Sequence, residues 1–212
     1  MSLRDTNIDR MRDGVVDVAI IGGGINGAVT AASLAGRGAS VALVDRADFA
    51  SETSQQSSNL VWGGFKYLEN YELPLVYKLC QSRNRLMKAY PDNVAELSFL
   101  AALDDSSPYP PWFAALGATA YWGIGRFRTR SPRLLSAEAI KDTEPAIDIS
   151  GVRGGIEYRD AYLRDNDARF VFGFVRSAIE SGAAVANYVE LTDARRVDRQ
   201  IGRASCRERV LR

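Results

Sequence analysis

Three glycines, Gly22, Gly24 and Gly27, follow a short apolar run and precede a run of small residues. In a G-x-G-x-x-G turn the first glycine permits a tight turn, the second lets the backbone approach a pyrophosphate, and the third lets the following helix pack closely on the strand. The N-terminus of that helix offers unpaired N–H groups and a partial positive charge to phosphate groups. This spacing predicts a dinucleotide-binding turn.

An acidic residue, Asp45, directly follows a second apolar run over residues 41–44. A carboxylate at the end of the second strand of such a unit accepts hydrogen bonds from the hydroxyls of the adenosine ribose. This arrangement argues against NADP, whose ribose carries a phosphate. Asp45 therefore favours NAD or FAD as the bound dinucleotide.

Regular elements must hold these residues in place, and the apolar patterning predicts where they lie. A strand over 15–21, a helix over 28–34 and a strand over 41–44 form a βαβ unit with a buried parallel sheet. The predicted fold class is α/β and Rossmann-like. Beyond this unit the pattern predicts a helix that ends before Pro91, strands over 97–103 and 151–158, a helix capped by Asp165 or Asn166 and closed by Gly182, and a strand over 183–191.

The composition is typical of a globular domain, since 46% of the 212 residues are hydrophobic and 25% are charged. A formal charge of +1 gives no field that would attract nucleic acid, so we expect no nucleic-acid partner. The sequence contains no histidine, which removes the commonest general base and metal ligand. We therefore expect no metal site and identify no catalytic residue, and any chemistry needs a cofactor or further sequence.

The cellular setting is indicated by the cysteines and the N-terminus. Cys80 and Cys206 are too few for a disulfide scaffold, and the polar start lacks the apolar segment of a secretory signal, which predicts a cytoplasmic location. The aromatic stretch 108–132 is too short in its apolar part to cross a bilayer. It fits either peripheral contact with the cytoplasmic face of a membrane, or a helix buried against the core with a solvated basic end.

The segment 53–69, TSQQSSNLVWGGFKYLE, follows the predicted βαβ unit. It resembles the flavin-contacting segment of the FAD-dependent glycerol-3-phosphate dehydrogenases, which belong to the D-amino-acid-oxidase-like flavoproteins. The glycine-rich N-terminal stretch, YLENYEL and DNDARFVFGFVRSAIESGAAVANYVEL share the resemblance, which covers most of residues 17–191. It implies an FAD-binding domain with an incomplete parallel sheet and helices, plus the start of a substrate or cap region.

The resemblance also implies roles for particular residues. Hydroxyls and loop N–H groups of the serine-rich loop can hold the pyrophosphate and the ribityl chain of FAD, and these residues are Thr53, Ser54, Ser57 and Ser58. Gly63 and Gly64 lack a Cβ atom, so their backbone can lie close to a flat ring. Lys66 and Tyr67 are the two substrate contacts that carry over from the family.

The activity implied by the resemblance is the oxidation of sn-glycerol 3-phosphate to dihydroxyacetone phosphate, with electrons passed to a membrane quinone. Two positions depart from the family pattern, because Trp62 stands where a histidine is common and Lys66 where an arginine is common. Lysine keeps the positive charge but lacks the bidentate fork that suits a phosphate. The alternatives are therefore a related FAD-dependent oxidase of an amine or a hydroxy acid, and a dinucleotide-binding module without redox turnover.

The expected organisation has four parts. Residues 1–70 form the first FAD-binding segment, 71–150 a helical and mixed substrate region, and 151–199 a returning strand–helix–strand segment. The stretch 200–210, QIGRASCRERV, matches the translation of a widely used sequencing adapter, so we expect 200–212 to be a non-native tail and the chain to be an inactive fragment. A native basic tail is the alternative.

Overall fold

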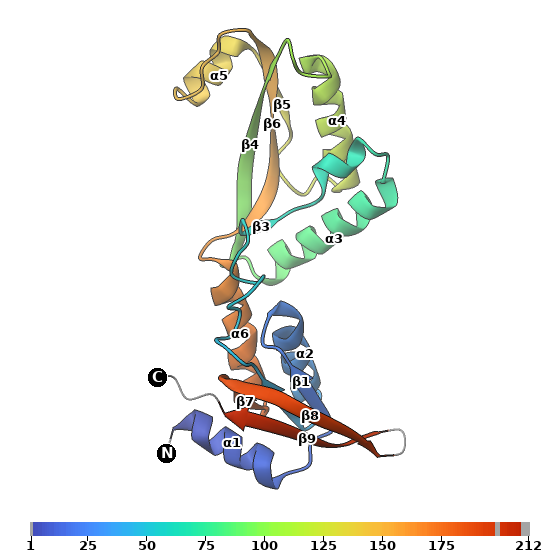
Figure 1. Cartoon of the computed structure of the whole chain (residues 1–212). Coiled ribbons are helices and arrows are strands. Elements are labelled where there is room, and N and C mark those ends of the chain that lie inside the picture. Colours follow the sequence, from blue (N-terminus) through green and yellow to red (C-terminus); the bar gives the residue numbers. More distant parts are fainter. Residues whose placement is uncertain (1, 198–199, 209–212) are drawn as a thin grey trace. The chain divides into compact units, whose positions relative to one another are not determined.

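A computed structural model describes residues 2–197 and 200–208 (Figure 1). The chain divides into two compact units: unit 1 comprises Met1–Ser58 and Asp165–Arg212, and unit 2 comprises Asn59–Arg164. These boundaries differ from those expected at residues 70 and 150. Unit 1 is thus assembled from both ends of the chain, and unit 2 is one continuous insertion.

A parallel sheet lies at the centre of unit 1. Its strands are β1 (Val18–Ile21), β2 (Val41–Val44) and β7 (Ala184–Ala186), in the order β1-β2-β7. The pairing Val18↔Val41 and Ala42↔Ala184 is parallel, which confirms the predicted α/β class. β1 begins at Val18 instead of residue 15, and just before it the Asp17 carboxylate accepts hydrogen bonds from Ser40.

Helices α2 (Ile25–Ala35) and α6 (Asp167–Glu180) pack against each other and the sheet. The small side chains of Ala28 and Ala31 on α2 share a buried core with Val171 and Val175 on α6. The predicted cap of α6 is confirmed at Asn166, whose side chain accepts a hydrogen bond from the Arg169 amide. A further helix, α1 (Leu3–Asp13), was not predicted from the polar N-terminus.

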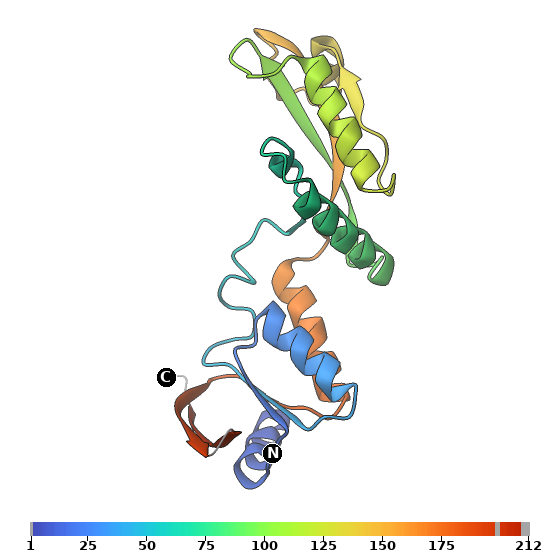
Figure 2. The same cartoon turned by 90° about the vertical axis from the view of Figure 1, so that its right-hand side faces the viewer.

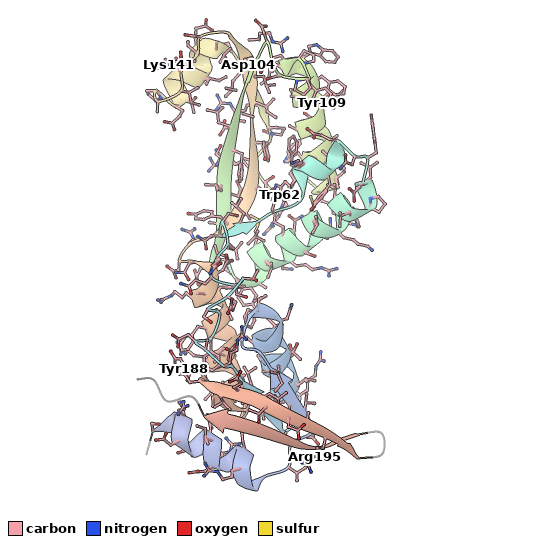
Figure 3. All side chains as sticks on the ribbon, viewed as in Figure 1. Trp62, Asp104, Tyr109, Lys141, Tyr188 and Arg195 are labelled. Carbon is pink, nitrogen blue, oxygen red and sulfur yellow. The ribbon has the colours of Figure 1, made fainter. Side chains whose placement is uncertain are left out.

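The chain changes direction after β7. Tyr188 adopts a left-handed backbone conformation with φ of 53°, and it separates β7 from β8 (Val189–Val197) (Figure 3). The prediction of one strand over 183–191 is therefore wrong, because this residue breaks it. β8 pairs antiparallel with β9 (Gln200–Glu208), so the tail expected to be non-native lies largely within β9, while residues 209–212 lie outside the described part. Its origin stays a prediction.

Unit 2 is built on an antiparallel sheet in the order β3-β6-β4, with β5 also pairing with β6. β4 (Val94–Asp104) and β6 (Val152–Leu163) are long partners, and they extend the strands predicted over 97–103 and 151–158. The shorter strands are β3 (Leu60–Val61) and β5 (Arg133–Leu135). A short 3-10 helix, η1 (Phe65–Leu68), follows β3.

Three helices complete unit 2: α3 (Leu73–Ala89), α4 (Pro111–Ile124) and α5 (Ala137–Thr143). α4 lies along the sheet and packs against β6 (Figure 2). Its Ala118 and Tyr121 are buried, whereas Trp112, Phe113 and Leu116 are exposed, so one side of the helix packs into unit 2 and contact of the other side with a membrane stays a prediction. Within the described residues no helix is long and apolar enough to cross a membrane.

Candidate functional site

The glycine turn joins β1 to α2 in the geometry that its spacing predicts. Gly22 has φ of 103°, a conformation that glycine adopts without strain, and its amide donates to the Val44 carbonyl at 2.8 Å. A Cβ atom on Gly27 would overlap the Gly22 carbonyl oxygen, so a side chain there would push the helix off the turn. Gly24 is the N-cap of α2. The turn therefore requires glycine at positions 22 and 27, and Gly24 marks the start of the helix.

Asp45 ends β2 beside this turn. Its Oδ2 accepts a hydrogen bond of 2.6 Å from the Gly23 amide, and its Oδ1 accepts one of 2.8 Å from the Ala47 amide. Both bonds fix the orientation of the carboxylate at the carboxyl end of the sheet. A carboxylate oxygen has more than one lone pair, so each can still accept a ribose hydroxyl.

A pocket of about 200 Å³ lies next to this turn, and its lining consists of Gly24, Asp45, Ala50, Ser51, Glu52, Thr53 and Ser54. Ser54 accepts a hydrogen bond of 3.1 Å from the Ile25 amide, which brings the serine-rich loop onto the start of α2. Thr53, Ser57 and Ser58 are exposed on the same loop. The structure therefore brings Thr53 and Ser54 together with Gly24 and Asp45 around one hollow.

The residues around this hollow fit a dinucleotide. The N–H groups at the start of α2 lack partners within the helix, as those of any first helical turn do. Such amides suit phosphate oxygens, while the carboxylate of Asp45 suits ribose hydroxyls. A side chain on Gly24 would narrow the hollow, because its Cβ would lie 3.2 Å from the Ser54 Oγ.

The remaining predicted residues, Gly63, Gly64, Lys66 and Tyr67, lie in unit 2. Gly64 has φ of 86° and starts η1, which contains both Lys66 and Tyr67. Lys66 is exposed, while Tyr67 is partly buried, with its ring centroid 5.6 Å from that of Trp62. These four residues form one short, ordered segment.

Sequence reasoning missed a buried polar cluster that holds this segment. Asp160 on β6 pairs with Arg83 on α3 at 3.0 Å and accepts the Tyr121 hydroxyl of α4 at 2.8 Å. Both Asp160 carboxylate oxygens lie 3.1 Å from the Gly63 amide nitrogen. The side chains of Arg83 and Asp160 are only 1% and 0% exposed. No local sequence pattern links these residues, because both charges stand among other polar and charged residues.

This cluster changes the explanation for Gly63. A Cβ atom at this position would overlap the Tyr121 hydroxyl and lie 2.9 Å from Arg83 Nη1. The position thus requires glycine because of the cluster beneath it. An approach of the Gly63 and Gly64 backbone to a flat ring stays a prediction.

Burial decides the protonation states in the cluster. Burial, together with the Asp160 charge, raises the pKa of Tyr121 far above its usual range, so the hydroxyl remains a donor. The same two causes raise the pKa of Tyr158 to about 12. Burial also raises the pKa of the Cys80 thiol, which therefore stays protonated and unreactive at neutral pH. The cluster is thus suited to holding structure and not to exchanging protons.

A parallel sheet, a glycine turn that feeds a helix and an acid at the end of the second strand define a dinucleotide-binding α/β protein. Residues 17–210 match the sequence profile of the DAO family, which is described as FAD dependent oxidoreductase. The chain belongs to this family.

Several known proteins are similar to the chain. A glycerol-3-phosphate dehydrogenase of Pseudomonas aeruginosa is 36% identical over 184 residues, which cover 86% of this chain and 34% of that protein. A D-erythritol 1-phosphate dehydrogenase of Brucella abortus is 34% identical over 180 residues, which cover 85% of this chain and 35% of that protein. The chain thus spans about a third of the length of these curated relatives.

A solved structure shares the fold. The glycerol-3-phosphate dehydrogenase from Bacillus halodurans, complexed with FAD, aligns with 97% of this chain and 33% of its own, with a TM-score of 0.71 and 22% sequence identity. At this level of identity the likeness concerns the fold alone.

Proposed function

We propose that unit 1 binds FAD. The amides at the start of α2 would hold the pyrophosphate, the Asp45 carboxylate would accept the adenosine ribose hydroxyls, and the loop with Thr53, Ser54, Ser57 and Ser58 would cover the phosphates. The observation that carries this proposal is the single hollow shared by Gly24, Asp45, Thr53 and Ser54. Membership of the FAD dependent oxidoreductase family supports FAD over NAD.

We further propose that the complete protein oxidises sn-glycerol 3-phosphate to dihydroxyacetone phosphate. When bound, the flavin supplies the two-electron oxidation of the C2 hydroxyl. Lys66 and Tyr67 would contact the substrate, since an exposed ammonium and a phenol suit a phosphate oxygen. Support comes from the names of the curated relatives, which include glycerol-3-phosphate and erythritol 1-phosphate dehydrogenases.

The test is anaerobic mixing of the complete, flavin-loaded protein with candidate substrates while the flavin absorption band is recorded. Bleaching by glycerol 3-phosphate, and not by glycerol, is expected. If erythritol phosphate bleaches the flavin and glycerol 3-phosphate does not, the substrate is a polyol phosphate longer than glycerol 3-phosphate. Bleaching by an amine or a hydroxy acid would favour the oxidase alternative, and a colourless protein that binds no FAD would contradict the whole proposal.

The proposed electron acceptor is a quinone, reached through peripheral contact with the cytoplasmic face of a membrane. The exposed apolar face of α4, formed by Trp112, Phe113 and Leu116, supports such contact. High salt or carbonate should release the complete protein from membranes, whereas retention under both treatments would contradict a peripheral contact. Reduced enzyme should be reoxidised by a soluble quinone analogue much faster than by oxygen.

A further inference from the structure

The segment from Trp62 to Tyr67 is held from beneath by the buried cluster of unit 2. β3 pairs with β6 through Leu60↔Tyr162 and Val61↔Ala161, and this ladder ends there. The amide of Gly63, two residues after Val61, donates instead to the side-chain carboxylate of Asp160. The carboxylate therefore continues the attachment of the segment to β6 beyond the last strand pair.

Asp160 is itself fixed from several sides. Arg83 Nη1 donates to it at 3.0 Å, the Tyr121 hydroxyl at 2.8 Å and the Ala161 amide at 3.1 Å. Arg83 also donates to the Tyr121 hydroxyl at 3.1 Å and, through Nε and Nη2, to Asn84. The buried charge is thus compensated by hydrogen bonds from two helices and a strand.

Aromatic packing extends this attachment to η1. Phe65 stacks on Tyr158 with ring centroids 4.4 Å apart and meets Tyr121 edge-on at 5.3 Å. Lys66 and Tyr67 follow Phe65 directly in the same 3-10 helix. Movement of Asp160 or Tyr121 would therefore displace the backbone that carries both residues.

A buried ion pair is weak evidence for stability, because apolar residues of similar volume often serve as well. In this cluster the pair holds Asp160 in an orientation in which it also accepts the Gly63 amide. We propose that Asp160, Arg83 and Tyr121 are positioning residues, which clamp the Gly63 backbone and thereby set the placement of Lys66 and Tyr67. The consequence for substrate affinity rests on the proposed function, whereas the clamp itself does not.

Two variants of the complete, flavin-loaded protein test this proposal. Asp160→Asn removes the charge, and Tyr121→Phe removes one hydroxyl with little change of volume. The matched control is Ile140→Val, which loses one methylene from a fully buried site of the same unit, away from the segment. Hydrogen exchange of peptides covering residues 60–68 reports on the clamp without any substrate.

Exchange at Gly63 should rise about tenfold in Tyr121→Phe and more in Asp160→Asn, and it should stay unchanged in Ile140→Val. The KM for glycerol 3-phosphate should rise roughly five- to tenfold in Tyr121→Phe, the range expected when one hydrogen bond is lost, with the same flavin content. Unchanged exchange in both clamp variants would overturn the proposal. Faster exchange with an unaltered KM in an active enzyme would overturn the positioning role.

If the unsubstituted protein oxidises no polyol phosphate, the proposed function fails and the exchange measurement alone decides on the clamp. Should Asp160→Asn not fold, Tyr121→Phe still gives both readouts, because its missing hydroxyl leaves the Arg83–Asp160 pair intact.

Discussion

The hydroxyl of Ser54 accepts a hydrogen bond from the amide of Ile25, the first residue of α2. This bond joins the serine-rich loop to the helix start, where an amide would otherwise have no partner. The loop is thereby held against the glycine turn, at the edge of the hollow next to Asp45. A loop that is fixed in this way loses less conformational entropy on binding than a free one.

Gly24→Val should abolish FAD binding. The new side chain would meet Ser54 Oγ and fill the space where a pyrophosphate approaches the backbone. The purified protein should lose its visible flavin absorbance while its thermal unfolding remains cooperative. The matched control is Gly173→Val on the exposed face of α6, where an added Cβ meets nothing. Normal flavin content in Gly24→Val would contradict the proposed site.

Asp45→Ala should weaken FAD binding, because it removes charge-assisted hydrogen bonds to the ribose that are worth roughly 1.5–3 kcal/mol each. The Kd, measured by titration of flavin fluorescence, should therefore rise by about one to two orders of magnitude. Asp17→Ala provides the control, since this carboxylate bonds with Ser40 before the start of β1. Equal effects of both substitutions would indicate a general loss of stability instead of a lost ribose contact.

Gly63→Ala should destabilise unit 2 by roughly 1–3 kcal/mol, the usual cost of overpacking a core. The added methyl group would overlap the Tyr121 hydroxyl. Tyr121→Phe removes this hydroxyl, so the double variant should recover part of the loss. A double-mutant cycle by urea unfolding measures the coupling. Strictly additive effects would show that the two residues do not meet as described.

Stability should fall at acidic pH in a manner that depends on Glu157. A hydrogen bond from Ser98, followed by the charges of Arg159 and Arg133, lowers the pKa of this carboxyl in the folded state. Its stabilising contribution is therefore complete above the unfolded pKa of about 4.3 and is lost as the pH falls through the lower folded value.

In Glu157→Gln the Tm should consequently fall less between about pH 5 and pH 3 than it does in the unsubstituted protein. Glu144→Gln, at an exposed position after α5, should leave the profile unchanged. The prediction fails when Glu157→Gln and the unsubstituted protein lose Tm in parallel over this range.

Much of unit 1 could be predicted because its determinants are local. Gly22, Gly24 and Gly27 stand within one turn, and the apolar run before Asp45 became β2 at the predicted residues. The cap at Asn166 was one of two adjacent candidates, and its side chain reaches an amide three residues away. Each of these features depends on interactions within a few residues of the chain.

The buried cluster could not be predicted because its members are far apart in the sequence. Arg83 and Asp160 are separated by 77 residues, and Tyr121 and Asp160 by 39. Their contact depends on how α3, α4 and β6 pack, which no local pattern encodes. For the same reason the sequence suggested flavin contact for Gly63 but could not show that the Tyr121 hydroxyl packs against this residue. The left-handed backbone conformation of Tyr188 was not predicted, because tyrosine is not a residue that typically adopts it.

The division of the chain has a consequence for protein engineering. The Leu163 amide donates to the Asn59 carbonyl at 2.8 Å, so the entry and exit of unit 2 are adjacent. An inserted segment whose two ends are adjacent can be replaced by a short linker without distorting the domain that carries it. Joining Ser58 to Asp165 through a few glycines would yield a minimal nucleotide-binding scaffold, into which the corresponding insertion of another flavoprotein could be transplanted.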